Sequence, residues 1–355
     1  MAILENVFLL LGGIATFLMG LKSMSDNLGE VVGSKMTKAI RACTKNRVSA
    51  LMVGGAVTAV LQSSIATNMI AITFVEKGIL SFYTVCAVIL GTNVGTTITA
   101  QLVSLSTISD FEISLVGCLI AFIGFLLTLF RGERTKKTGC AIFGFGLIFI
   151  GLRLMTESVE CFKNYAFFTR LFLVKSPPIL LLNGILITCI VQSSSVVTSV
   201  LILLASVGLI DFYSALFIVL GANIGTCFPV IFSSLNLSME SKKAATFNLV
   251  FNVFGTAIFF LILVLFPDLM QRALTFSSTS IGRNVANFHT VFNLAVSLIL
   301  LPVLKPFCKI VEKFCEYLYS NQSSIKAKNM RNSRAVEARI KEGSVKNKTS
   351  LKSVN

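Results

Sequence analysis

One long stretch of the sequence occurs twice in the chain, and this repeat limits the possible architectures more than any other feature. Residues 58–97 align without a gap on residues 188–227, with 13 identities. The identities are mostly polar residues and glycines, while the apolar residues between them differ, so apolar composition alone does not produce the match. An internal repeat in an apolar chain is typical of membrane carriers built from two related halves.

The chain is apolar along most of its length. Of its 355 residues, 54% are hydrophobic and 13% are charged, whereas a soluble domain has about 25% charged residues. The first apolar run has no basic residue before it and is followed by Lys22, so we expect a transmembrane helix and no cleaved signal peptide. The sequence predicts an all-α polytopic membrane protein. The expected spans are residues 3–21, 82–103, 113–130, 143–155, 212–232, 244–266 and 285–304.

Two further apolar stretches, residues 48–75 and 179–209, are too long for a single crossing and carry polar residues in the middle. The first is interrupted at Gln62-Ser63-Ser64, and the second at Gln192 to Ser195. A polar break in the middle of such a stretch indicates two short helices that meet at a turn, which is a re-entrant hairpin. The expected architecture is therefore two repeats, each with one hairpin, and about seven full spans in total.

The charges in the loops suggest an orientation. We place the basic loops 22–47 and 131–137 and the basic tail in the cytoplasm, which puts the acidic loop 104–112 outside. Seven crossings then leave the N-terminus outside and the C-terminus inside. The first hairpin enters from the cytoplasm and the second from outside, so the two halves are inverted. Loop 156–178 fits poorly, because it carries more basic than acidic residues on the outer side.

We divide the chain into a first membrane repeat (1–137), a second repeat with an additional final span (138–305) and a basic cytoplasmic tail (306–355). The net charge is +15, and the chain from Lys305 onward has 12 Lys and Arg against 4 Glu. This pattern is typical of a cytoplasmic segment next to anionic lipid headgroups rather than of a nucleic-acid-binding protein. We expect the tail to be partly disordered beyond about residue 320.

The polar residues of the hairpins are the candidate site. Unpaired amides and hydroxyls in hydrocarbon cost several kcal/mol, so they need partners. Helix-to-helix hydrogen bonds would satisfy them, but the same cluster recurs in both halves. A broken helix whose oxygens coordinate Na+ and whose N–H groups meet an anion is the favoured interpretation. The candidate ligands are Gln62, Ser63, Ser64, Thr67 and Asn68, and Gln192, Ser193, Ser194, Ser195 and Thr198.

A second motif follows each hairpin and begins with two glycines four residues apart, at residues 91–97 and 221–227. The glycine spacing alone favours close helix packing. The asparagines and threonines in the motif suggest more, namely that the asparagines brace the hairpins and the threonines face the site. The candidate supporting residues are Asn93, Thr96, Thr97, Asn223 and Thr226.

No Lys or Arg occurs in residues 48–75, 82–104, 179–209 or 212–234. An anion bound there would be held by neutral donors, helix dipoles and co-bound cations. Transfer of a dianion from water to a low-dielectric site has a large free-energy cost. Two or more bound Na+ ions would offset this cost, which is a physical reason for cation coupling. The nine cysteines have no metal-ligand spacing, so we expect no metal ion other than Na+, and no disulfides.

The only histidine, His289, shares a helix face with Asn293. A polar packing pair is the favoured interpretation, and a proton-sensing role is the alternative.

The two Gln-Ser-Ser clusters, each followed by a Gly-x-Asn-x-Gly-Thr motif, and the Phe-His-Thr-Val-Phe-Asn segment resemble the type II sodium/phosphate cotransporter family over about residues 4–305. The resemblance implies Na+-coupled uptake of inorganic phosphate across the cytoplasmic membrane, with Na+ as coupling ion and no enzymatic activity. It transfers the binding roles to Gln62, Ser63, Ser64, Gln192, Ser193, Ser194 and Ser195.

The chain departs from the family pattern at three places. Ile65 stands where the first signature has a third serine, and Cys227 replaces the last threonine of the second glycine motif. Many bacterial relatives continue into a helical PhoU-like domain, whereas a short basic tail follows here.

Three alternatives remain: transport or export of another small anion, a membrane enzyme with a serine nucleophile, and a scaffold without transport. The enzyme is disfavoured because the hairpins contain no Asp or Glu and His289 is the only candidate base. The sequence does not determine the oligomeric state, and a homo-oligomer is compatible with it.

Overall fold

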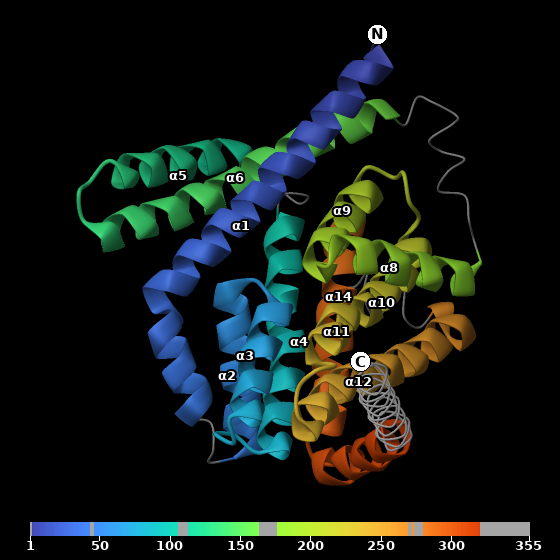
Figure 1. Cartoon of the computed structure of the whole chain (residues 1–355). Coiled ribbons are helices and arrows are strands. Elements are labelled where there is room, and N and C mark those ends of the chain that lie inside the picture. The colour runs from blue at the N-terminus through green and yellow to red at the C-terminus, as the bar shows by residue number, and fades with distance from the viewer. Residues whose placement is uncertain are drawn as a thin grey trace, which may run out of the picture. The chain divides into compact units, whose positions relative to one another are not determined.

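The computed structural model describes residues 2–42, 46–105, 113–162, 176–268, 272 and 280–319. All regular secondary structure in this part of the chain is helical (Figure 1). The helices are α1 (Ala2–Ala42), α2 (Arg47–Leu61), α3 (Ser64–Glu76), α4 (Phe82–Leu105), α5 (Ile113–Thr128), α6 (Glu133–Phe162), α8 (Pro177–Val191), α9 (Ser194–Ser206), α10 (Phe212–Gly225), α11 (Cys227–Ser234), α12 (Met239–Leu265) and α14 (Ile281–Leu300).

The chain separates into two compact units, Met1–Cys308 and Lys309–Asn355. The first unit contains all of the helices named above. In the second unit, the described residues 309–319 belong to a helix that begins at Leu304 and ends at Tyr319. The predicted disorder beyond about residue 320 falls outside the described residues.

Five helical segments of the described chain are long and apolar enough to cross a membrane, or six if α14 and the helix after it form one span. Helix α5 has 16 residues, about 24 Å at 1.5 Å per residue, and is short for a crossing of about 30 Å. The multi-pass, all-helical class is therefore confirmed. The number of seven crossings and the inverted orientation stay predictions. The five candidate spans are Leu4–Val32, Phe82–Leu105, Glu133–Val159, Phe212–Ser234 and Met239–Leu265.

The distribution of polar and apolar side chains suits a lipid environment. Helix α5 presents Leu119 and Phe122, both 58% exposed, away from the protein. The interior holds amides and hydroxyls beside its apolar side chains, among them the fully buried Asn293 and Thr67. Apolar groups thus face outward and many polar groups face inward, as expected where the surrounding solvent is hydrocarbon.

The predicted breaks at the two Gln-Ser-Ser clusters are present. Helices α2 and α3 form the first hairpin and lie against α4, and helices α8 and α9 form the second and lie against α10 (Figure 1). Glycines bring each hairpin close to its neighbour. A Cβ added at Gly91 would lie 1.9 Å from the Leu51 carbonyl oxygen, and one at Gly221 would lie 2.0 Å from that of Leu181. The same backbone approach thus recurs at the equivalent place in the second repeat, and it explains the glycine spacing of both motifs.

The two halves pack together through α14. This helix contacts α4 from the first repeat and α9 from the second, and α4 also contacts α9 directly. The Ser297 hydroxyl donates to the Leu90 carbonyl at 3.1 Å across the α14–α4 interface. On the other side of the first repeat, α6 packs along both α1 and α5. Helices α4, α9 and α14 thus connect the two repeats within the first unit.

Residues 22–47 do not form the predicted basic loop, because α1 continues to Ala42. No proline interrupts this segment, and contacts with other helices hold it. The Ser25 hydroxyl donates to the Leu61 carbonyl at 2.5 Å, and Glu30 pairs with Lys137 at 2.6 Å. At about 1.5 Å per residue, the 41 residues of α1 reach about 60 Å, well beyond the hydrocarbon thickness. The basic residues that we interpreted as a loop therefore lie mostly on the second half of α1.

One other predicted boundary was wrong, and one predicted span contains a break. Most of the basic segment 131–137 is helical, since α6 begins at Glu133, whose carboxylate pairs with Lys137 one turn later at 2.8 Å. The predicted span 212–232 corresponds to the candidate span Phe212–Ser234, but within it the helix is broken at Thr226, between α10 and α11. Pro229 explains this break, because it has no N–H to donate to the carbonyl of Gly225 four residues earlier. In loop 156–178, residues 156–162 belong to α6, and Lys163, Arg170 and Lys175 lie outside the described residues.

Candidate functional site

Both hairpins turn in the same way at their tips. In the first, Gln62 takes the left-handed conformation (φ 53°, ψ 22°) and its N–H donates to the Thr58 carbonyl, which ends α2. Ser63 is extended and starts α3, with its hydroxyl oxygen accepting from the Ala66 N–H at 3.2 Å. In the second hairpin Gln192 has φ 58° and ψ 24°. The Gln-Ser pair therefore provides a helix C-cap and a helix N-cap on adjacent residues.

The left-handed glutamines are unusual. Gln62 and Gln192 are the non-glycine residues with positive φ in the described chain. Glycine normally fills this position because a side chain costs about 1 kcal/mol or more there. A glutamine retained in this strained conformation in both halves suggests that its amide has a task at the hairpin tip.

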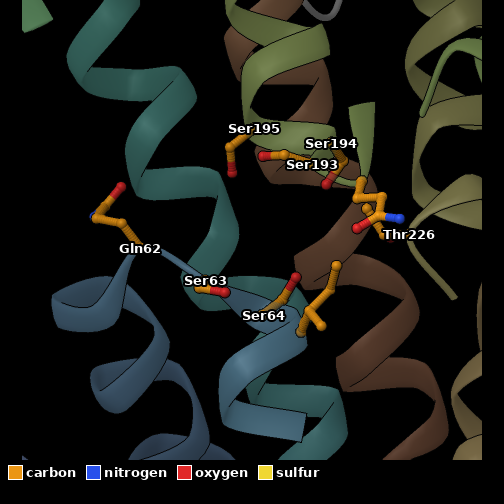
Figure 2. A pocket seen from close by; sticks show the side chains of 9 residues that line it. Gln62, Ser63, Ser64, Ser193, Ser194, Ser195 and Thr226 are labelled. Atoms are coloured by element: carbon orange, nitrogen blue, oxygen red, sulfur yellow. The ribbon is translucent and has the colours of Figure 1, made fainter. Parts of the chain in front are cut away.

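The two tips meet. Figure 2 shows the serines of the first hairpin on one side of a cavity and those of the second hairpin on the other. The cavity volume is about 70 Å³. One water needs about 10–15 Å³ on this measure, so there is room for about five water-sized groups, the scale of a small inorganic ion. The lining residues are Gln62, Ser63, Ser64, Ile65, Gln192, Ser193, Ser194, Ser195 and Thr226.

Seven of the ten candidate ligands line this cavity, and three do not. Thr67 is fully buried and its hydroxyl donates to the Ser63 carbonyl at 3.1 Å. Asn68 accepts from the Thr92 hydroxyl at 2.8 Å, which ties α3 to α4. Thr198 is buried within α9. Thr67 and Asn68 therefore stabilise the first hairpin behind its tip.

Of the five supporting residues, Thr226 lies at the site as we expected, and the other four do not line the cavity. The Asn93 and Asn223 amides donate to carbonyls one turn earlier in their own helices, Ile89 and Val219, rather than to the hairpins. Thr226 lines the cavity, but its counterpart Thr96 is not among the lining residues. The Thr96 and Thr97 hydroxyls both bond to carbonyls of α4.

All side chains that line the cavity are neutral. Helices α3 and α9 both begin there, and the first N–H groups of a helix have no partner within it. Two helix N-termini thus direct positive partial charge at one cavity, an arrangement that favours an anion. The hydroxyls of Ser64, Ser194 and Ser195 make no hydrogen bond within the described chain and are available to a ligand.

The cavity also offers oxygen ligands for a hard cation. Helices α2 and α8 end at the tips, so their last carbonyls carry the negative end of the helix dipole. Hydroxyl, amide and carbonyl oxygens suit Na+. No group of three or more His, Cys, Asp or Glu side chains that could hold a transition metal occurs among the described residues.

One residue with a direct contact at the tip was not predicted. The Thr99 hydroxyl, on α4, donates to the amide oxygen of Gln62. Thr99 lies just beyond the repeated segment, and the equivalent position in the second repeat is Pro229. Extending the alignment by these two positions would have shown the difference between the halves.

His289 lies apart from the cavity lining. It is fully buried on α14, and its two ring nitrogens have no hydrogen-bond partner within the described chain. The Asn293 amide donates to the His289 backbone carbonyl at 2.8 Å, so the two residues share a helix face as predicted.

At its far end, the first hairpin is attached to α12. The Glu76 carboxylate, at the exposed end of α3, accepts from the Ser238 N–H at 2.9 Å and from the Ser241 hydroxyl at 2.6 Å. Hydrogen bonds from Ser238 and then Ser241 hold the pKa of Glu76 below its usual value. The equivalent position in the second repeat is Ser206, so this charged attachment belongs to the first hairpin.

Apolar helices that surround a small polar cavity define the chain as a multi-pass membrane protein. Residues 16–157 and 170–292 match the model of the family described as Na+/Pi-cotransporter, and the chain belongs to this family. The family is one of transporters, and the predicted resemblance is thereby confirmed.

Similar proteins include the "Uncharacterized protein YqeW" of Bacillus subtilis, which is 29% identical over 84% of this chain and 94% of its own length. The "Putative inorganic phosphate export protein YjbB" of Escherichia coli K12 is 27% identical over 85% of this chain, which spans only 55% of that protein. The "Sodium-dependent phosphate transport protein 2A" of Rattus norvegicus is 32% identical over 110 residues, which are 30% of this chain and 17% of the rat protein. No solved structure matches the chain.

Proposed function

We propose that the protein is a secondary carrier in the cytoplasmic membrane that moves inorganic phosphate together with Na+. The observation that carries this proposal is the neutral cavity between two hairpin tips, which combines two helix N-termini with hydroxyl and amide oxygens. The family supports phosphate transport, and the name of the rat relative supports sodium dependence.

In this proposal the anion lies between the starts of α3 and α9. Free N–H groups and the hydroxyls of Ser64, Ser194 and Ser195 donate to its oxygens. Because the lining carries no charge, the cost of transferring phosphate from water is offset by cations. Na+ would be coordinated by the amide oxygens of Gln62 and Gln192 and by carbonyls at the ends of α2 and α8. Because each ion lowers the free-energy cost of binding the other, phosphate and Na+ would bind and cross together.

The inverted topology is the second part of the proposal. A hairpin that enters from each side would place the cavity near the middle of the membrane, and rocking of one half against the other would open it alternately. The internal repeat of tip geometry and glycine contacts supports such a mechanism.

The protein could also carry phosphate out of the cell, because the E. coli relative is named as a putative phosphate export protein. The same site serves both directions, since the ion gradients determine net flux. A different small anion is the alternative substrate.

The test is uptake of radiolabelled phosphate into proteoliposomes under an inward Na+ gradient, with a choline gradient as the reference. Arsenate and sulfate as competitors test the choice of anion. We expect Na+-dependent accumulation that phosphate and arsenate inhibit. Equal flux in Na+ and choline would contradict the sodium coupling, and stronger inhibition by sulfate than by phosphate would contradict the substrate. Preloaded vesicles with a reversed gradient compare efflux with uptake.

Two variants test the site. The second hairpin keeps three consecutive serines, whereas Ile65 replaces the third serine in the first hairpin. We therefore expect the second hairpin to contribute more to the site, and Ser194→Ala to weaken phosphate affinity. Loss of such a hydroxyl costs about 1–3 kcal/mol, roughly tenfold to hundredfold in apparent affinity. Gln192→Ala should also reduce the Na+ dependence. The matched control is Ser206→Ala, at the other end of α9, where the hydroxyl bonds to the Leu203 carbonyl of its own helix. If the half-saturating concentrations of phosphate and Na+ are unchanged in Ser194→Ala and Gln192→Ala, the motif serves helix packing and not ligand binding.

A further inference from the structure

The amide of Gln62 is held at both ends. Its nitrogen donates to the Ala59 carbonyl of α2, and its oxygen accepts from the hydroxyl of Thr99 on α4. Thr99 is 3% exposed and does not itself line the cavity. The backbone of Gln62 is fixed as well, in the left-handed conformation that ends α2. The side chain thus has a single orientation, determined by two different helices.

This arrangement leaves one lone pair on the Gln62 oxygen. A carbonyl oxygen can accept two hydrogen bonds or ligand contacts, and Thr99 uses one of them. The Ala59 carbonyl can only accept a hydrogen bond, so it holds the amide nitrogen of Gln62 and leaves the amide oxygen to face the Thr99 hydroxyl on α4. An amide oxygen held in place before a cation arrives needs no reorganisation when it binds, which raises affinity.

The second hairpin lacks this device. Pro229 occupies the position that corresponds to Thr99 and has neither a hydroxyl nor an N–H. The Gln192 side chain is exposed and makes no hydrogen bond within the described part of the chain. Two glutamines with the same backbone conformation therefore differ in whether their amides are fixed.

We propose that Thr99 is a positioning residue that sets the affinity for the coupling cation by fixing the amide oxygen of Gln62, so that the two Gln-Ser-Ser tips have unequal roles. This inference rests on the proposed Na+-coupled transport. The first tip supplies a fixed cation ligand, and the second supplies a glutamine whose amide is not fixed by a hydrogen bond within the described chain.

The alternative is that the Thr99 bond only attaches α2 to α4. A purely structural bond would lower the amount of folded protein and alter the half-saturating concentrations of Na+ and phosphate together. A positioning role changes the Na+ dependence and acts only when Gln62 is present. These two signatures can be separated by one set of variants.

The experiment measures phosphate uptake against Na+ concentration at matched membrane abundance for Thr99→Val, Thr99→Ser, Gln62→Ala and the double variant T99V/Q62A. Valine keeps the shape of threonine but removes the hydroxyl, and serine keeps the hydroxyl. Thr84→Val on the same helix is the control, because the Thr84 hydroxyl pairs locally with Ser81 and lies outside the cavity lining.

Loss of a neutral hydrogen bond corresponds to about a 2- to 10-fold change in affinity. We expect Thr99→Val to raise the half-saturating Na+ concentration by about this factor, with the half-saturating phosphate concentration unchanged at saturating Na+. Thr99→Ser and Thr84→Val should behave as the wild type, and Thr99→Val should add nothing in the Gln62→Ala background. Additive effects of the two substitutions, or parallel shifts for both substrates, would overturn the inference.

A second measurement separates this inference from the proposed function. If the wild-type protein shows no Na+-driven phosphate flux, the proposed function fails. The thermal stabilisation of the purified full chain by NaCl relative to choline chloride then tests Thr99 directly. A smaller Na+-specific stabilisation in Thr99→Val than in the wild type and Thr84→Val supports the positioning role. Equal stabilisation in all three, or none in the wild type, overturns it.

Discussion

Gly91→Ala tests whether the close approach of α2 and α4 positions the first hairpin tip. The added Cβ would lie 1.9 Å from the Leu51 carbonyl oxygen and 2.8 Å from the Gly55 nitrogen. Cβ contacts under 3.0 Å essentially never occur, so the helices must separate by about 1.1 Å at this point. Both neighbouring atoms belong to the backbone, so no side chain can rotate to relieve the contact.

The cost can be estimated from overpacked cores, where inserted methyl groups destabilise by about 1–3 kcal/mol. We take the upper end because backbone is displaced, and subtract about 1 kcal/mol for the better helix propensity of alanine. The net loss is about 2 kcal/mol, roughly 30-fold in the ratio of folded to unfolded protein. A displacement of about 1 Å also exceeds the tolerance of about 0.5 Å for a preorganised binding site. The folded fraction should therefore transport phosphate with weaker affinity.

The assay combines denaturant unfolding in mixed micelles with phosphate uptake at matched abundance. Gly55→Ala is the matched control on the same helix pair, because its Cβ would be 3.4 Å from the nearest atom, the Gly91 carbonyl oxygen. Gly12→Ala is a second control, since no atom lies within 4 Å of its Cβ. If Gly91→Ala unfolds and transports like these two variants, the close approach does not position the tip.

Three further predictions concern other parts of the chain. Ile65→Ser should lower the half-saturating Na+ concentration in uptake assays by restoring a hydroxyl at the first tip, and an increase would contradict this. The Glu76 contacts with Ser238 and Ser241 should stabilise the fold above pH 4.5, the usual carboxyl pKa, and be lost as the pH falls through the lower pKa of the folded state. Glu76→Gln should therefore flatten the acid side of a plot of unfolding midpoint against pH, and an unchanged plot would refute the link. Deletion of residues 321–355 should leave uptake into proteoliposomes largely intact, and complete loss in a normally inserted protein would show that the tail takes part in transport.

The hairpins were predictable because polar residues in the middle of a long apolar stretch are compatible with few backbone structures in a membrane. Backbone groups in hydrocarbon must be satisfied within the segment, so a Gln-Ser-Ser cluster in a stretch too long for one span marks a turn between helices. The serine that follows each glutamine is also a favoured N-cap, as the structure shows at Ser63 and Ser193. Local chemistry was sufficient for this part of the fold.

The helix boundaries outside the repeats were harder to predict. Residues 22–42 continue α1 because Ser25 and Glu30 bond to other helices. Such contacts are not visible in the periodicity of a single segment, and charge density alone suggested a loop. The break at Thr226 was not predicted, although Pro229 is visible in the sequence. The stretch is apolar throughout, so we interpreted it as one continuous helix.

The meeting of the two tips was expected only through the repeat. Residues of the two repeats can be recognised as equivalent from the sequence, but equivalence does not place them together. The structure brings Ser64 and Ser194 to one cavity and leaves Thr67 and Asn68 behind the tip. Whether a polar residue faces the cavity or a neighbouring helix depends on where the helix begins and on which side of it the residue lies. The order of polar residues in the sequence does not give this information.

The differences between the repeats matter as much as the likeness. A cavity between two identical tips would offer the same ligands from both sides and could not assign an anion and its cations to different places. This chain differs at Ile65 against Ser195 and at Thr99 against Pro229. The first difference places more hydroxyls at the second tip, and the second fixes the amide only at the first tip. Under the proposed function, both changes would separate the roles in the same sense: donors for phosphate would be concentrated on α9, and a fixed cation ligand would lie at the end of α2.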